Sequence, residues 1–452
     1  MLPDEVVDVR YKCGWSRNYS NLGALFIFLI LSSLFFGRGL VGHFSASYVG
    51  IGTDPGAFIL FFEWWKYALT HHVNPLFINT VWAPTGYNLT WTASIPLFGI
   101  LAIPITATFG PVASYNILML MSPAFAAWAA FLLCRYLCSS FWPALVGGYV
   151  FGFSPYILCQ LLGHLNLVAV FPIPLIVAVM LLRLDCKIRV PSHIVLLSIL
   201  LIVQFLCFPE IVATGTIFAV VAFGLAWWIA PQWRRRLQGL ILPTFCAYTA
   251  SALFASPYLY YFFVSGGPTF PDRLSAAGSV RPPNFLIPTT TNLFGTLTLV
   301  RKLCRGHLNY EAGAYIALPI LLIVLSFARL HWQNWSTRLL LTLLGIVCIA
   351  SLGPTRHVGG NWSFFMPWSV FSHLPLIAAA LPMRFPVYCF LILGIILSLW
   401  LSDDLLHKRV RILGACGVVL FTLPNLSASY WATRIDIPAF FAHRLYTHYL
   451  SR

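Results

Sequence analysis

Long apolar runs, separated by short polar connections, recur along nearly the whole chain. A helix needs about 20 mostly apolar residues to cross a bilayer. About eleven runs approach that length: residues 22–43, 112–136, 140–157, 165–184, 192–208, 211–230, 238–263, 313–330, 337–352, 385–402 and 410–426. The pattern predicts an all-α, polytopic membrane bundle over residues 1–426, followed by a short tail, 427–452.

The segment 94–109, "SIPLFGILAIPITATF", is apolar but short, and prolines interrupt it. Whether it crosses the membrane decides the side of every later loop. If it does not cross, the basic loops between the other helices all face the cytoplasm with the N-terminus, as the positive-inside rule requires. These loops contain Arg135, Arg183, Lys187, Arg189, Arg234, Arg235, Arg236, Arg329, Arg338, Lys408, Arg409 and Arg411. We therefore predict that the segment is re-entrant or interfacial, on the outer face, and buried against other helices.

This topology places three long loops on the outer face: 44–111, 264–312 and 353–384. The tail follows on the same side. Within the first loop, residues 57–72 combine aromatic and apolar side chains with a single lysine, Lys66, which is typical of a helix lying in the membrane interface. Loops of this length usually carry function in a compact protein. The outer loops are therefore the predicted location of the functional site.

Composition supports the membrane interpretation. Hydrophobic residues make up 59% of the 452 residues and charged residues only 9%, whereas soluble domains have about 25% charged residues. The net charge of +15 comes from the loop clusters expected of a membrane protein, so it does not indicate nucleic-acid binding. The cysteines show no Cys-x-x-Cys pair and no metal-ligand spacing, so no protein metal site is predicted.

The 12 carboxylates of the chain fall into two groups according to the predicted side of the membrane. Those beside cytoplasmic basic residues are expected to be solvated: Asp4, Glu5, Asp8, Asp185, Asp403 and Asp404. Those on the outer side are Asp54, Glu63, Glu210, Asp272, Glu311 and Asp436. A carboxylate close to the hydrocarbon is energetically costly, so its presence there indicates a functional role. Asp54 and Glu210 are therefore the candidates of most interest.

Asp54 precedes Pro55 at the start of the predicted interfacial helix, so it could cap that helix. It could equally act as a general base that accepts a proton from an acceptor hydroxyl. Glu210, after "FLCFP", could cap the helix that begins at Ile211 or contact substrate. Glu311 begins a predicted helix, where a first-turn carboxylate is favourable, so capping is its preferred interpretation over substrate binding.

Two basic or titratable side chains have alternative roles as well. His164, in "GHLNL", is either a hydrogen-bonded turn histidine or a residue that orients Asp54 or holds a phosphate. Arg384, in "LPMRFPVY", lies at the outer end of a span, where it could simply extend toward water. Its alternative role is to bind phosphate, because a guanidinium matches phosphate oxygens in a forked geometry.

A series of short motifs occurs in a characteristic order from about residue 44 to 400. The motifs are "GTDPGAF", "NPLFINTVWAPTGYNLTWTASIPL", "FGPVASYN", "LCRYL", "GGYVFGFSPY", "GHLNL", "YEAGAYIALP" and "MRFPVY". In this order they resemble bacterial multispanning proteins of the GT-C glycosyltransferase superfamily, near YfhO-like and mannosyl- or arabinosyltransferase-like members. The resemblance implies an enzyme of the bacterial cytoplasmic membrane that transfers a sugar from a polyprenyl-phosphate donor to a glycan, lipid or protein acceptor outside the cell.

On this sequence, the resemblance makes Asp54 the base of an inverting transfer, with His164, Asn166, Glu210, Glu311 and Arg384 as candidate substrate-binding residues. Many GT-C enzymes have paired acids in the first outer loop and another acid in the second. Here His164 and Asn166 stand where that second acid is expected, which weakens the case for a carboxylate-bound divalent cation as cofactor. The alternatives are a transporter or flippase for a lipid-linked substrate, and a membrane scaffold.

Overall fold

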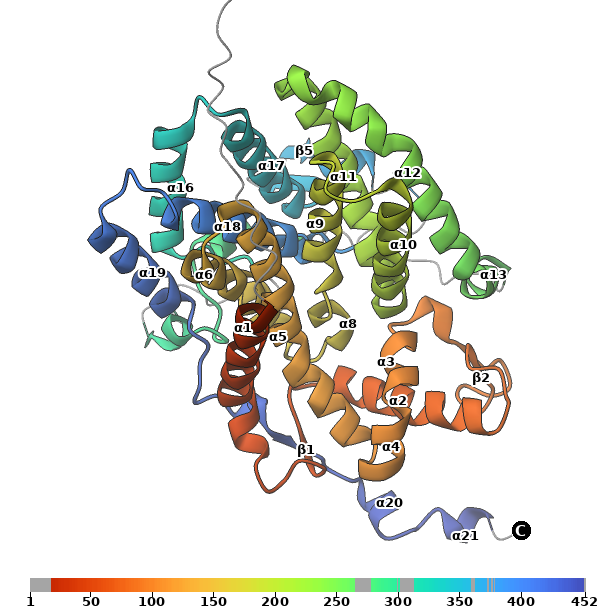
Figure 1. The fold of residues 1–452 in the computed structure, drawn as a ribbon. Coiled ribbons are helices and arrows are strands. Elements are labelled where there is room, and N and C mark those ends of the chain that lie inside the picture. Colours follow the sequence, from red (N-terminus) through yellow and green to blue (C-terminus); the bar gives the residue numbers. More distant parts are fainter. Residues whose placement is uncertain are drawn as a thin grey trace, which may run out of the picture.

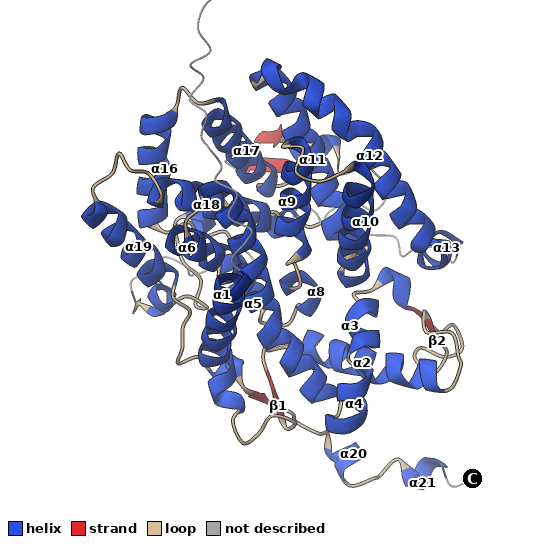
Figure 2. Ribbon diagram, in the orientation of Figure 1, coloured by secondary structure: helices blue, strands red, loops and turns tan. Residues whose placement is uncertain are grey.

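The computed structural model describes residues 18–264, 278–298, 300, 313–358, 362–371, 374, 377 and 379–450. Within this part of the chain the fold is a bundle of helices with only three short, two-stranded antiparallel ladders (Figure 2). The ladders are β1 (Ser47–Tyr48) with β6 (Thr433–Arg434), β2 (Phe77–Ile78) with β3 (Tyr87–Asn88), and β4 (Thr355–Val358) with β5 (Trp362–Phe365). The all-helical expectation is confirmed apart from these ladders.

Eight helical segments within the described residues are long and apolar enough to cross a membrane. They are Tyr19–Leu40, Pro111–Cys138, Phe141–Gln160, Leu165–Leu184, Val190–Cys207, Pro209–Ile229, Pro231–Phe254 and Pro382–Leu401. The three other predicted spans form shorter helices, α16 (Leu318–His331), α17 (Trp335–Ser351) and α19 (Lys408–Thr422). Every predicted span therefore corresponds to helix, and the total of about eleven crossings stays a prediction.

The centre of the bundle consists of α5 (Pro111–Cys138), α6 (Phe141–Gly152) and α18 (Pro386–Leu401), which pack on one another. Helix α18 is apolar on all sides, and nearly all of its residues are buried. Gly147 and Gly394 let α6 and α18 approach closely, since a Cβ added to either glycine would lie 2.7 Å from the backbone oxygen of the other. Small residues at such contacts are typical of helices that pack within membranes.

Several predicted spans are broken into two helices. The first break separates α6 from α7 (Pro155–Gln160), and the next separates α8 (Leu165–Val168) from α9 (Pro172–Leu184). A third separates α12 (Arg234–Phe254) from α13 (Ser256–Val264). Proline begins α7, α9 and α11 (Pro209–Ile229), because a residue without an N–H group suits the first turn of a helix. These breaks bring irregular backbone, including His164, to the end of the bundle near α2 (Asp54–Thr70).

Residues 94–109 form two short helices, α3 (Pro96–Leu101) and α4 (Ile103–Phe109). Neither is long enough to cross a bilayer, because each residue adds about 1.5 Å to a helix. Both pack on α2, while α3 also contacts α10 (Val190–Cys207) and α4 contacts α5. The Trp65 indole donates a hydrogen bond to the carbonyl oxygen of Ser94 at 2.9 Å. Residues 94–109 are therefore short, interrupted and packed against other helices, while their re-entrant or interfacial place on the outer face stays a prediction.

The helices α2, α3 and α4 gather at one end of the bundle, together with the tail helices α20 (Ala439–Ala442) and α21 (Thr447–Leu450) (Figure 1). The connections from α11 to α12 and from α16 to α17 lie at the opposite end (Figure 1). At or beside these two connections lie five of the twelve basic residues of the topology argument, Arg234, Arg235, Arg236, Arg329 and Arg338. The cytoplasmic side of the basic loops stays a prediction.

Two carboxylates expected to be solvated are not. Asp403 has only 10% of its side chain exposed and lies 2.7 Å from Nε2 of His331. Asp185 is partly buried and accepts a hydrogen bond from the hydroxyl of Tyr136. The expectation was wrong for both because the partner side chains come from other helices, which local sequence does not reveal. Asp404 is fully exposed, as expected.

Candidate functional site

Asp54 lies in the first turn of α2, with Pro55 next to it. The N-cap residue of α2 is Thr53, not Asp54, and no side-chain capping bond is made there. Instead, Oδ2 of Asp54 lies 3.0 Å from Nε2 of His164. Capping is therefore wrong as the sole role of Asp54: the proline and the helix dipole favour its place in the chain, while the carboxylate itself is directed at a histidine from another part of the fold.

His164 occupies the turn between α7 and α8, where its backbone N–H bonds to the carbonyl oxygen of Gln160 at 2.8 Å. The two chain segments meet closely. The N–H of Ile51 bonds to the carbonyl oxygen of Leu162 at 2.7 Å, and a Cβ added to Gly163 would lie 3.4 Å from Cβ of Asp54. The His164 side chain is 17% exposed, whereas that of Asp54 is 57% exposed. Asp54 is thus the member of the pair that solvent or a substrate reaches.

The environment stabilises the ionised form of Asp54. The hydrogen bond from His164 is the largest cause, and it holds the pKa of the Asp54 carboxyl below its ordinary value. Partial burial acts in the opposite direction, and the positive charges of His164 and Arg384 add to the lowering. Asp54 is therefore a carboxylate at neutral pH. Within the described part of the chain, its second oxygen, Oδ1, has no hydrogen-bonding partner.

Glu210 and Arg384 form a second pair. Oε2 of Glu210 accepts a hydrogen bond from Nη1 of Arg384, and the backbone N–H of Leu381 lies 3.4 Å from Oε1. The two side chains are only 10% and 15% exposed, respectively. The N-cap position of α11 belongs to Phe208, and Glu210 lies in the first turn of the helix, so Glu210 is not the N-cap residue. Arg384 also lies over the ring of Phe208, with Cζ 5.6 Å from the centroid.

Arg384 belongs to a turn before α18, far from α2 in sequence, and its charge is a minor cause of the lowered pKa of Asp54. The structure joins four of the residues singled out in the sequence into two pairs, Asp54 with His164 and Glu210 with Arg384. Whether they line one outward cavity stays a prediction.

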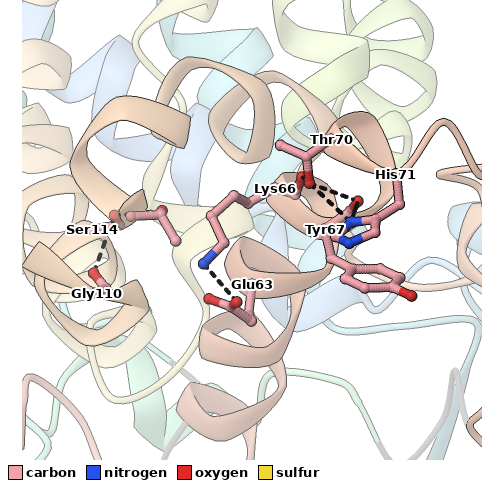
Figure 3. Close-up of polar contacts among 8 residues, drawn as sticks. Glu63, Lys66, Tyr67, Thr70, His71, Gly110 and Ser114 are labelled. Carbon is pink, nitrogen blue, oxygen red and sulfur yellow. Dashed lines mark hydrogen bonds and ion pairs between the residues drawn. The ribbon is translucent and has the colours of Figure 1, made fainter. Parts of the chain in front are cut away.

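The remaining candidates differ in their surroundings. Asn166 is 3% exposed in α8, and its Oδ1 has no hydrogen-bonding partner among the described residues. Glu311 and Asp272 lie outside the described residues. Glu63, the other carboxylate of α2, pairs with Lys66 at 2.6 Å on a partly exposed face (Figure 3). Such a surface pair indicates a structural role for Glu63.

Some residues that support the site were not identified from the sequence. Asn116 accepts a hydrogen bond from the N–H of Val49 at 3.1 Å and donates to the carbonyl oxygens of Phe44 and Ser47 at 2.8 Å. The hydroxyl of Tyr115 donates to the carbonyl oxygen of Val49 at 3.0 Å. The motif "FGPVASYN" contains both side chains, so their polar character within a predicted span was the available signal.

The described residues contain no cluster of side chains typical of a divalent-cation site. Among the described residues, no three His, Cys, Asp or Glu side chains gather closely enough to hold a metal ion. Glu210 is engaged by Arg384, and the arginine's charge acts on Asp54. A nearby guanidinium opposes binding of a cation to that carboxylate. No step of the chemistry below depends on a metal.

Comparison with known proteins places the chain in a family. The family model described as "Domain of unknown function (DUF6311)" matches residues 23–421. The chain belongs to this family. The DUF6311 region covers α2, both pairs described above and most of the helices. No curated protein matches the chain significantly in sequence.

The DUF6311 fold resembles a solved membrane enzyme. The crystal structure of the Archaeoglobus fulgidus oligosaccharyltransferase in the apo form matches with a TM-score of 0.56 at 12% sequence identity. The match covers 96% of this chain and 60% of that structure, so the chain corresponds to little more than half of the archaeal protein. The similarity shows that this chain shares the overall fold of that structure.

Proposed function

We propose that this protein is a membrane glycosyltransferase that transfers a sugar from a polyprenyl-phosphate donor to an acceptor hydroxyl on the outer face of the membrane. The observation that carries the proposal is the Asp54 carboxylate, which is ionised, partly exposed and held by His164 beside the positive charge of Arg384. The GT-C-like fold supports the same class of chemistry. The expected setting is the bacterial cytoplasmic membrane.

In the proposed reaction, Asp54 acts as the general base. Its Oδ1 accepts the proton of the acceptor hydroxyl while the acceptor oxygen bonds to the anomeric carbon. The bond from that carbon to the phosphate oxygen breaks, and its electron pair leaves with the polyprenyl phosphate. A single displacement of this kind inverts the anomeric configuration. Because a carboxylate with a lowered pKa is a weak base, the proton moves only as the new bond forms.

His164 is proposed as a positioning residue. Its Nε2 is occupied by Asp54, and most of its ring is buried, so the ring itself is poorly placed to meet an acceptor. A base must stay within hydrogen-bonding distance of the hydroxyl it serves. By holding Oδ2, His164 leaves Oδ1 directed toward the acceptor. Asn166, two residues further along, is even more buried than His164, so its expected contact with substrate stays a prediction.

Arg384 is proposed to bind the departing phosphate. A guanidinium has five N–H donors, of which Nη1 serves Glu210 while Nε has no hydrogen-bonding partner within the described residues. Glu210 fixes the orientation of the guanidinium and shares its charge. Donors aimed at a developing negative charge stabilise the transition state when they are already in place.

The decisive test is a transfer assay with the purified full-length protein in lipid vesicles. Labelled polyprenyl-phosphate sugars are supplied with hydroxyl acceptors, and both sugar transfer and donor hydrolysis are measured. We expect one polyprenyl phosphate to be released for each molecule of donor consumed. Movement of intact donor between the leaflets, with no bond broken for any donor in the panel, would instead identify a flippase.

Replacing His164 by glutamine is expected to move the acidic limb of the pH profile to higher pH. The hydrogen bond and the charge of His164 both lower the pKa of Asp54, and glutamine can offer only a neutral amide N–H in their place, so the pKa rises toward its ordinary value. Asp54 then takes up its proton, and loses its activity as a base, at a higher pH. Turnover at neutral pH is expected to fall roughly 10- to 100-fold, because the carboxylate is less well placed.

The matched control is His71→Gln, at the other end of α2, where the histidine is exposed and stacks on Tyr67 (Figure 3). This variant is expected to keep both the rate and the pH profile of the unmodified protein. Rates measured from acid to neutral pH distinguish the two variants. An unshifted acidic limb in His164→Gln would show that the histidine does not act through Asp54.

A further inference from the structure

The segment that follows α19, residues 425–435, returns to the first outer loop and binds it just before α2. Strand β6 in this segment pairs with β1, so that Ser47 faces Arg434 and Tyr48 faces Thr433. Figure 1 shows the chain running from α19 down to β1 at the end of the bundle where α2 lies. The ladder therefore joins residues near the two ends of the chain.

Hydrogen bonds extend this pairing on both sides. The N–H of Gly50 bonds to the carbonyl oxygen of Tyr430 at 2.8 Å, and the hydroxyl of Thr433 donates to the carbonyl oxygen of Gly50 at 2.5 Å. Beyond the ladder, the N–H of Ile435 bonds to the carbonyl oxygen of Ala46 at 3.1 Å. The segment thereby fixes the backbone on both sides of β1, four residues before Asp54 at its nearest point.

The same segment also binds a later outer loop. The hydroxyl of Tyr430 donates to the carbonyl oxygen of Thr290 at 2.9 Å, and the N–H of Asn425 bonds to the carbonyl oxygen of Thr291 at 2.8 Å. In turn, the hydroxyls of Thr289 and Thr291 lie 3.5 and 3.6 Å from Sγ of Cys159. Cys159 belongs to α7, the helix that leads to His164.

Residues 46–51 are therefore held from several sides. On one side are α5 and the 425–435 segment, and on the other is the turn that carries His164, through the bond from Ile51 to Leu162. Gly50 allows this close packing: it has a φ of +117°, and a Cβ there would lie 2.6 Å from the carbonyl oxygen of Leu162. Only glycine adopts such a backbone without strain.

We propose that residues 425–435 are a positioning strap that holds Asp54 against His164. These hydrogen bonds join the strap to the backbone of neighbouring segments and not directly to Asp54 or His164. It acts through the backbone of residues 46–51 on one side and through the 289–291 loop and α7 on the other. The inference rests on the proposed function in one respect only, namely that the Asp54–His164 geometry matters for turnover.

The physical reason is the short length of the elements being held. A two-residue ladder and a loop cannot keep a carboxylate in place alone, because isolated hairpins of this size are marginal in water. A catalytic group must stay within roughly 0.5 Å of its productive position. The segment is anchored by Trp431, which is only 3% exposed and packs on Phe36 with the ring centroids 4.8 Å apart, so its hydrogen bonds supply that restraint.

The test compares two truncations of the full chain in lipid vesicles. One ends after Leu423 and removes the strap, and the other ends after Asp436 and removes only the residues beyond it, which include the exposed Phe441 and Tyr449. Without the strap, amide hydrogen exchange of residues 46–54 is expected to accelerate. The turnover number is expected to fall roughly 100-fold, with the KM for donor changed by less than about twofold.

The acidic limb of the pH profile is also expected to move upward in the strap-less protein, because Asp54 loses the bond that lowers its pKa. The truncation after Asp436 is expected to match the full chain in exchange, turnover and pH profile. Unchanged exchange or an unchanged turnover number after removal of the strap would overturn the proposal.

A milder full-length variant decides the question if the shorter truncation does not fold. Thr433→Val removes the hydroxyl bonded to Gly50, and turnover is expected to fall roughly threefold to tenfold, with faster exchange at residues 46–51. Thr447→Val, which removes a hydroxyl bonded only within the exposed α21 region, is the matched control. Equal behaviour of these two variants would overturn the strap. If the full chain transfers no sugar, the proposed function fails, and the exchange data alone decide whether the strap holds residues 46–54.

Discussion

Replacing Asp54 by asparagine is expected to lower sugar transfer by roughly 10²- to 10⁴-fold, the range typical for loss of a general base. Asparagine has nearly the same shape as aspartate and still presents an oxygen to His164, but it has no proton-accepting carboxylate. Donor binding is expected to persist or to strengthen slightly. The reason is electrostatic: the substitution removes a negative charge near Arg384, which is the proposed phosphate ligand. Parallel measurements of transfer and of donor binding in vesicles test both statements.

The chain offers a control on the same helix. Glu63→Gln also removes one carboxylate from α2, but Glu63 is engaged in a partly exposed pair with Lys66 (Figure 3). Such pairs contribute about 0–1 kcal/mol to stability, so this variant is expected to fold and to turn over normally. Wild-type turnover in Asp54→Asn would remove Asp54 as the base. Loss of activity in both variants would point to a general need for negative charge on α2.

The second large effect is expected at the Glu210–Arg384 pair. Removing one partner of a buried ion pair typically destabilises a protein by roughly 3–5 kcal/mol, because the other charge is left uncompensated. Glu210→Gln and Arg384→Gln are each expected to lower the free energy of unfolding by that order. The double variant, Glu210→Gln with Arg384→Gln, is expected to recover most of the loss, since two neutral amides replace the pair. Thermal unfolding in detergent measures all three.

Activity in the double variant separates structure from chemistry. If Arg384 binds the departing phosphate, the double variant regains stability but not transfer, and its KM for donor stays raised. If the arginine serves only to neutralise Glu210, transfer returns together with stability. The second outcome would contradict the proposed phosphate contact while leaving the Asp54 base unaffected.

The candidate residues were found in the sequence for a simple reason. In a chain with few charges, each carboxylate near the hydrocarbon needs an explanation, and that reasoning selected Asp54 and Glu210. The partners were harder to assign. For His164, orienting Asp54 was one of the roles that the sequence offered, but no local pattern selected it. For Arg384, the sequence did not indicate which acid it meets. Asp403 and Asp185 show the same limit, because their partners, His331 and Tyr136, come from distant helices.

The sequence by itself determined the membrane class, the position of the predicted spans and the short, interrupted nature of residues 94–109. These features follow from the length and spacing of apolar runs, which act locally. Only the tertiary structure decided that Asp54 pairs with His164, that Glu210 pairs with Arg384, and that residues 425–435 hold the first loop. These contacts join residues over 100 positions apart, and they form only where helix breaks, turns and packing bring distant segments to the same end of the bundle.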